Sequence, residues 1–294
     1  MNQENLNYII STDSGCDLSI DVCKENNIMP LLMNYYDEEK IYTDTMKQED
    51  IIKLYHRMIE GKMYKTTAVN ITEGYEFLKS LMHYNQPIVH IALGSGISGT
   101  YNNMVQAKEL VLKEYPNANI TIIDSTLASL GYGLLVLEAS KLRKEGKTIS
   151  EVISYIENNK SGINPYFTTN TLTYLARGGR VTKIASIFGN VLSIRPILRL
   201  DDKGHLLVHA KGHGKTKTIK KMKELVEEAA INPQEQTLYI SHSLAIDDAI
   251  EYGELLQKEL GFKNIMYSYI GSIIGSHTGP GLVAVFFHGK DRFK

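Results

Sequence analysis

A glycine-rich loop at residues 94–100 holds the first side chains that could do chemistry. The stretch IVHIALGSGISGTYNNM, residues 88–104, runs from apolar residues into glycines and hydroxyls and then into a helical pattern. The first backbone amides of a helix are unpaired and carry partial positive charge, which suits a carboxylate or a phosphate. Ser95, Ser98 and Thr100 add hydroxyl donors. The loop is therefore a candidate anion site, or else a tight turn in which Ser98 caps the helix.

Established nucleotide and hydrolase motifs do not fit this loop. A P-loop needs a lysine directly after its last glycine, whereas Gly99 is followed by Thr100 and Tyr101. The spacing also differs from the dinucleotide fingerprint and from the G-x-S-x-G nucleophile elbow. What remains is a general capacity to hold an anion.

A second cluster, 275-GSHTGPG-281, places His277 in a loop with three glycines and Pro280. A histidine can donate a hydrogen bond to an anion and, when protonated, neutralise its charge. A lone histidine is more often structural, but the glycines and the proline indicate a backbone shaped around this one. We therefore take His277 as a candidate ligand of the same anion.

Two further segments carry anion-binding side chains. Arg177 and Arg180 of 177-RGGR-180 could clamp an anion or pair with surface carboxylates, and the surface role is favoured when the motif is taken alone. Thr66 and Thr67 of 65-KTTAVN-70 precede a helix, where plain N-capping is the simpler interpretation.

Several functional classes are excluded by composition. The 294 residues carry a formal net charge of −1, which gives no bias toward nucleic acid. No His or Cys pair has zinc spacing and no acidic loop resembles a calcium site, so we expect no metal. Cys16 and Cys23 suit a reducing compartment. With no signal peptide pattern and no apolar run near the ~20 residues of a membrane helix, we expect a cytoplasmic protein.

A lysine-rich segment, residues 211–223, is the strongest charge run in the chain. Such a run is usually the solvated face of a helix, and the alternative is a docking site for an acidic partner. Its members are Lys211, Lys215, Lys217, Lys220, Lys221 and Lys223.

The first half of the chain alternates short apolar strands with amphipathic helices. The expected strands are 8–11, 28–34, 88–93 and 120–123. This order predicts a mostly parallel sheet with helices on both faces. Ligands bind such sheets at the carboxyl ends of the strands, where 12-TDSG-15, 94-GSGISGT-100 and 124-DS-125 should meet.

The second half mixes hairpins with helices. A break at residues 158–165 suggests a boundary, and Asp201-Asp202-Lys203-Gly204 predicts a hairpin turn. Strands are expected at 238–241, 264–269 and 282–288, with a glycine-rich turn before the last, and helices at 182–193, 216–230 and 247–260. We predict an α/β protein of two domains: residues 1–160, Rossmann-like with a parallel sheet, and residues 161–294, α/β with a mixed or antiparallel sheet.

The order of seven segments resembles the DegV family over nearly the whole chain. They are 12-TDSGCDL-18, 66-TTAVN-70, 94-GSGISGTY-101, 123-IDSTLASLGYG-133, 175-LARGGR-180, 194-IRPIL-198 and 276-SHTGPG-281. DegV proteins are bacterial fatty-acid-binding proteins. The resemblance implies an acyl tail buried between and within the two domains. It also implies, for some members, presentation of the fatty acid to a separate kinase that makes acyl-phosphate.

The resemblance further implies which residues hold the carboxylate. The family's threonine, loop serine and HTGPG histidine correspond here to Thr66, Ser95 and His277. By the same resemblance, Arg177 or Arg180 would contact these residues from a second layer around the carboxylate.

Thr67 and Gly96 are expected close to the same site. Two departures from the family pattern are visible. The loop after Thr66 lacks the usual proline, and Gly94 replaces the first serine of the usual Ser-Ser pair.

These expectations describe a carrier with no catalytic residue and no cofactor, whose ligand is a long-chain fatty acid such as palmitate or oleate. A fatty-acid kinase is the expected partner, and transient membrane contact is compatible with this role. Two alternatives stay open. One is a serine esterase or thioesterase with Ser95 or Ser98 as nucleophile and His277 as base. The other is a phosphate- or nucleotide-binding regulator.

Overall fold

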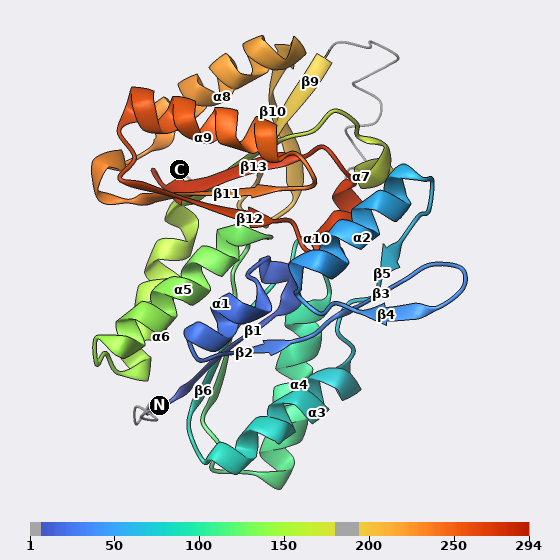
Figure 1. The fold of residues 1–294 in the computed structure, drawn as a ribbon. Helices are drawn as coiled ribbons and strands as arrows, with labels where there is room; N and C mark the ends of the chain where they lie inside the picture. Colours follow the sequence, from blue (N-terminus) through green and yellow to red (C-terminus); the bar gives the residue numbers. More distant parts are fainter. Residues whose placement is uncertain (1–6, 180–193, 294) are drawn as a thin grey trace.

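Three sheets organise the chain in the computed structural model, which describes residues 7–179 and 194–293. A parallel four-stranded sheet and a mixed six-stranded sheet lie one above the other, and a small antiparallel sheet flanks them (Figure 1). The α/β fold class with a parallel sheet and a separate mixed sheet is therefore confirmed. The division into domains at residue 160 stays a prediction.

The parallel sheet has the order β2-β1-β6-β7. Its strands are β1 (Ile9–Asp13), β2 (Ile28–Leu31), β6 (Ile88–Ala92) and β7 (Ile120–Asp124). β1 and β6 are buried along their whole length, as expected for central parallel strands covered on both faces.

Helices cover both faces of this sheet, as predicted. On one face, Val89 and Ile91 share a core with α5 (Leu130–Lys144). On the other, Ile88 packs with α3 (Ile71–Leu81) and α4 (Thr100–Glu114). Helix α3 begins at a capping box between Asn70 and Glu73. Helices α1 (Ile20–Glu25), α2 (Gln48–Ile59) and α6 (Ile149–Asn159) complete this half.

The mixed sheet has the order β10-β9-β8-β13-β11-β12. Its strands are β8 (Ile163–Thr168), β9 (Ile194–Leu200), β10 (Leu206–His213), β11 (Thr237–His242), β12 (Asn264–Tyr269) and β13 (Val283–His288). Only β11 and β12 pair in parallel. The predicted hairpin around residues 201–204 is confirmed, because β9 and β10 pair antiparallel across it.

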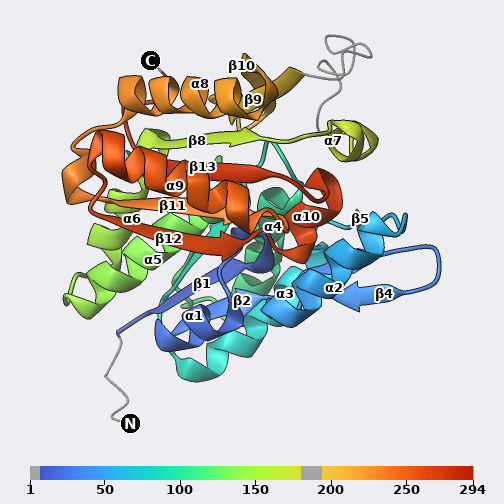
Figure 2. The same ribbon diagram turned by 45° about the horizontal axis from the view of Figure 1, so that its top comes forward.

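The second face of the mixed sheet packs against the first half of the chain. Helices α8 (Gly214–Ala229) and α9 (Ile246–Leu260) cover one face (Figure 2). From the opposite face, Phe167, Leu198 and Phe286 join the same core as α5 and β6. The two large sheets therefore share one apolar core.

Two expected elements differ in the structure. The strand predicted at 28–34 is divided into β2 and β3 (Asn34–Tyr36), because the Met33 amide donates to Ser14 Oγ (3.1 Å) and turns the chain. Strand β3 then pairs with β4 (Ile41–Thr43) and β5 (Lys65–Thr66).

The glycine-rich turn predicted before the last strand is instead helix α10 (Ser272–Thr278). Its buried Ile273 gives it an apolar side, and Gly279, with φ +69°, ends it. Helices α6 and α7 (Thr173–Arg177) were not predicted from the sequence. The helix expected at 182–193 lies outside the described residues. Within the described part of the chain, no helix is long and apolar enough to span a bilayer.

Candidate functional site

The three motifs expected at the carboxyl edge of the parallel sheet do meet there. The buried carboxylate of Asp13 accepts hydrogen bonds from the Leu93 amide (2.9 Å) and from the Tyr132 hydroxyl (2.6 Å). The Gly94 amide donates to the Leu127 carbonyl (2.8 Å). The ends of β1, β6 and β7 are thereby tied into one polar edge.

Ser95 is engaged by a carboxylate of this edge. Its Oγ donates to Asp124 Oδ2 (2.5 Å), and its amide donates to Asp124 Oδ1 (3.0 Å). A serine hydroxyl has one proton to donate, so Ser95 can donate to a bound anion only after leaving Asp124. Sequence reasoning placed Asp124 at the correct edge but did not assign it this partner.

Thr66 and His277 are brought together from distant parts of the chain. Thr66 Oγ1 and His277 Nε2 form a hydrogen bond of 2.6 Å, and both residues are half-buried. Thr66 comes from β5 and His277 from the last turn of α10. When the imidazole nitrogen donates, the threonine hydroxyl keeps its own proton for an external acceptor.

The second half of the glycine loop holds the Thr66 segment in place. Thr100 Oγ1 accepts from the Val69 amide (3.2 Å), and the Asn103 side chain donates to the Val69 carbonyl (2.8 Å). Ser98 is hydrogen-bonded to Thr100 at 2.9 Å. The loop therefore connects the Asp124 edge with the strand that carries Thr66.

The described part of the RGGR motif brings its backbone close to this pair. A Cβ at Gly178 would lie 2.4 Å from His277 Nδ1, so only glycine lets the backbone approach the imidazole this closely. Arg177 is exposed, and its Nη1 lies 3.2 Å from the sulfur of Met63. Arg180 lies outside the described residues, and Thr67 is exposed.

Gly96 is an inter-sheet contact. A Cβ at Gly96 would lie 2.0 Å from the Lys203 carbonyl oxygen in the β9–β10 turn. The turn of the mixed sheet therefore rests directly on the glycine loop, which explains one of the loop glycines by packing alone.

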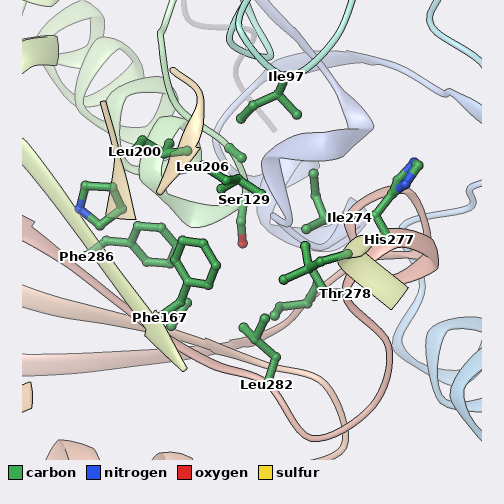
Figure 3. A pocket seen from close by; sticks show the side chains of 15 residues that line it. Ile97, Ser129, Phe167, Leu200, Leu206, Ile274, His277, Thr278, Leu282 and Phe286 are labelled. Atoms are coloured by element: carbon green, nitrogen blue, oxygen red, sulfur yellow. The ribbon is translucent and has the colours of Figure 1, made fainter. Parts of the chain in front are cut away.

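An apolar cavity lies between the polar edge and the mixed sheet (Figure 3). With the space at its mouth it amounts to about 640 Å³. Its lining comes from the glycine loop, the start of α5, β8, β13 and α10, and includes Ile97, Ser129, Phe167, Ile274, Leu282 and Phe286. His277 lines it as well, and Figure 3 shows its ring on the side away from the two phenylalanines.

The cavity and the polar pair thus adjoin through a single residue. Among the described residues, His277 borders the cavity, whereas Thr66 and Ser95 do not. The geometry offers an apolar chamber with a hydrogen-bonding end. Ala284 and Phe286 of β13 line the chamber, but the strand is apolar and buried at nearly every position, so its sequence does not mark which face borders a cavity.

Three of the six lysines in the lysine-rich segment pair with acidic side chains. Lys215 pairs with Asp248 and Glu251, each at 2.6 Å. Lys221 pairs with Glu224 and Lys223 with Glu227, both along α8. These contacts favour the solvated helix face over a docking site for an acidic partner.

The fold, the cavity and the polar edge together define an α/β protein with two large sheets and an apolar chamber, and the comparisons place it in a family. Residues 8–290 match the family model described as an uncharacterised protein of the DegV family. A DegV domain-containing protein of Clostridium perfringens is 39% identical over 288 residues, which cover 97% of this chain and 98% of that protein. The chain belongs to the DegV family.

Two solved structures share this fold. A DegV-family protein of Ruminococcus gnavus, solved with vaccenic acid, is 24% identical with a TM-score of 0.86, covering 96% of this chain and all of that one. The fatty acid kinase (Fak) B3 protein of Streptococcus pneumoniae, loaded with linoleic acid, is 17% identical with a TM-score of 0.84, covering 96% and 99%. Among the described residues of this chain, no group of three or more His, Cys, Asp or Glu side chains could hold a metal ion.

The contact between Gly178 and His277 generates a prediction. In Gly178→Ala the new methyl group displaces the imidazole and breaks its hydrogen bond to Thr66. The ring ¹⁵N signals of His277 should therefore shift in a histidine-labelled sample. Gly99→Ala is the matched control, because a Cβ there meets nothing closer than 3.9 Å. Unchanged His277 signals in Gly178→Ala would contradict the close contact.

Proposed function

We propose that this protein binds one long-chain fatty acid, with its acyl chain in the apolar cavity and its carboxylate at the Thr66–His277 pair. The observation that carries the proposal is the junction of a chamber lined by apolar side chains with a half-buried threonine–histidine pair. The fatty acids in the R. gnavus and S. pneumoniae structures of the same fold support it.

The two parts of a fatty acid make different energetic demands. Transfer of about 14 methylenes at roughly 0.8 kcal/mol each contributes on the order of 11 kcal/mol before the cost of association. An unpaired carboxylate at the cavity wall would cost several kcal/mol. The hydroxyl of Thr66 offsets part of that cost by donating to a carboxylate oxygen, while the imidazole of His277 donates to Thr66 and orients it.

Ser95 is the third proposed ligand of the carboxylate, and its hydroxyl would exchange Asp124 for the fatty acid as hydrogen-bond acceptor. With Asp124 as acceptor, its hydroxyl is occupied. We infer that the fatty-acid carboxylate competes with Asp124 for this proton, and that Arg177, Thr67 and Gly96 belong to the surroundings of the head group.

A carrier fits the side-chain geometry better than a hydrolase. The Ser95 hydroxyl donates to a carboxylate rather than to the imidazole of His277, and Ser98 is bonded to Thr100. A serine nucleophile needs a hydrogen bond to its general base. In the proposed function, the protein therefore binds its ligand without hydrolysing it.

Presentation to a fatty-acid kinase is the proposed consequence of this binding. The S. pneumoniae protein that shares this fold is a fatty acid kinase B protein. Here the exposed Thr67 and Arg177 lie on the segments that carry the polar end of the site. A phosphorylating enzyme would reach the carboxylate from that side.

The first prediction concerns the ligand itself. Native mass spectrometry of the purified protein should show one bound species, and organic extraction should release a C14–C18 fatty acid. A protein that is empty and takes up neither palmitate nor oleate would overturn the proposed function.

The second prediction concerns the head-group residues. Thr66→Val keeps the side-chain shape and removes the hydroxyl, and Ser95→Ala removes the other donor. Hydrogen bonds to a charged group contribute about 1.5–3 kcal/mol, so each variant should bind palmitate roughly 10- to 100-fold more weakly in a fluorescent fatty-acid displacement assay. Thr43→Val, in the same small sheet, is the control. Equal affinity in all three variants would remove Thr66 and Ser95 from the site.

The third prediction concerns the kinase. With a purified fatty acid kinase and ATP, ADP release should require the palmitate-loaded protein. Charge reversal at Lys221 and Lys223 should leave the rate unchanged, because both side chains already pair with glutamates of α8. A rate that falls with the charge reversal would restore the docking role of the lysine-rich segment, and ADP release without the loaded protein would refute presentation.

A further inference from the structure

Asp17 is a buried side chain to which the proposed fatty-acid site gives no role. It belongs to the segment 12-TDSGCDL-18, directly after η1 (Ser14–Cys16), and is only 3% exposed. Both of its carboxylate oxygens accept hydrogen bonds. The Gly271 amide donates to Oδ1 (2.9 Å), and the Ser129 hydroxyl donates to Oδ2. One side chain therefore joins two segments that lie far apart in the sequence.

The two segments that Asp17 joins both form walls of the apolar chamber. Ser129 lines the chamber at the start of α5. Gly271 directly precedes α10, which presents Ile274 and His277 to the same chamber. Figure 3 shows Ser129, Ile274 and His277 around this space. The contacts of Asp17 thus connect the wall of the acyl chamber with the helix that carries the head-group histidine.

The start of α5 needs an anchor because Ser129 has an unusual backbone conformation. Its φ is +57° and its ψ is −149°, a region that residues other than glycine rarely adopt. Such a conformation persists only where the surroundings hold it. The Ser129 hydroxyl also lies 3.0 Å from the Ser241 hydroxyl of β11. When Ser241 donates to Ser129 and Ser129 donates to Asp17, the carboxylate is the last acceptor of a chain that begins in the mixed sheet.

The start of α10 is held by the same carboxylate. Helix α10 spans only Ser272–Thr278, so His277 lies in its last turn and a shift of Gly271 is passed along one short helix to the imidazole. A negative group near the beginning of a helix is also favoured by the helix dipole. The Tyr55 hydroxyl adds a bond to the Ile270 carbonyl (2.8 Å), so the entry to the helix is held from two sides.

We propose that Asp17 is a positioning residue for fatty-acid binding: it fixes the starts of α5 and α10 relative to each other and, through α10, keeps His277 in hydrogen-bonding contact with Thr66. The inference rests on the proposed function, because it concerns the same head-group pair. Within the described part of the chain, Asp17 is not among the residues that line the chamber, and it acts on the ligand through α10. Support of this kind behind a binding group is what keeps the group in its productive geometry.

Position 17 allows the carboxylate to be removed without a change of backbone conformation. Asp17 has φ +56°, in the left-handed region, where glycine and asparagine are tolerated better than alanine. Asp17→Gly deletes both acceptors and keeps this conformation. Asp17→Asn keeps an acceptor for the Gly271 amide, and its own amide can donate to Ser129. Burial already raises the pKa of the Asp17 carboxyl well above its usual range, so the neutral amide is a mild change there.

The experiment measures two properties of the full chain: the ring ¹⁵N signals of His277 in a histidine-labelled sample, and palmitate affinity by fluorescent displacement. In Asp17→Gly the His277 signals should shift, and palmitate should bind at least tenfold more weakly. In Asp17→Asn both properties should stay close to those of the unchanged chain. Asn27→Gly, at an exposed position with φ +50°, is the matched control and should change neither.

The proposal is overturned if either property is unchanged in Asp17→Gly, or if Asp17→Asn loses palmitate as strongly as Asp17→Gly does. If Asp17→Gly does not fold, Gly271→Ala takes its place. The new Cβ would lie 2.9 Å from Asp17 Oδ1 and must displace the carboxylate, while φ −67° at this position suits alanine. Unchanged His277 signals in Gly271→Ala would equally refute the proposal.

Failure of this proposal can be told apart from failure of the proposed function. If the unchanged chain binds no palmitate, the proposed function is refuted. The His277 signals do not require a ligand, so they still decide whether Asp17 positions the imidazole. If the unchanged chain binds palmitate and Asp17→Gly leaves the His277 signals in place, only the role of Asp17 is refuted.

Discussion

The buried carboxylate of Asp13 is the constraint on which the arrangement of this molecule depends. It lies where β1 ends, under the second sheet, and has no access to water. Its oxygens accept from the amides of Gly15 and Leu93 and from the Tyr132 hydroxyl. Burial raises its pKa in spite of these donors. Because each donor belongs to a different segment, satisfying one carboxylate fixes the first turn, the glycine loop and helix α5 relative to one another.

The glycine loop illustrates how one motif serves several purposes. Gly96 lets the β9–β10 turn approach, and Thr100 anchors the strand that carries Thr66. Ser95 meets a carboxylate of its own sheet. The hydroxyls of Ser95 and Thr100 are thus held by partners in the first half of the chain, while Gly96 provides the contact with the mixed sheet.

Much of this arrangement could be predicted from the sequence, and the reason is local. The period of the apolar residues marks β1, β6, β7 and the helices between them, and Asn70 with Glu73 marks the start of α3. Family motifs point to Thr66 and His277 without showing that they touch. Their hydrogen bond joins residues 211 positions apart, and no local pattern encodes such a distance. Helix α10 was hidden for a related reason, since its glycines suit a turn and the residues that hold it come from distant segments: Thr66 bonds to His277, and the Tyr55 hydroxyl donates to the Ile270 carbonyl just before the helix.

The length of chain between Thr66 and His277 also has a consequence for synthesis. A ribosome delivers the parallel sheet, the glycine loop and Thr66 long before it delivers α10. The apolar chamber lacks most of its lining until β8 and β13 have been added. A nascent chain therefore leaves the chamber-facing side chains of the first half, such as Ile97 and Ala128, uncovered until β8 and β13 have been made. Closure of this core accordingly requires β13, which takes its place in the middle of the mixed sheet between β8 and β11.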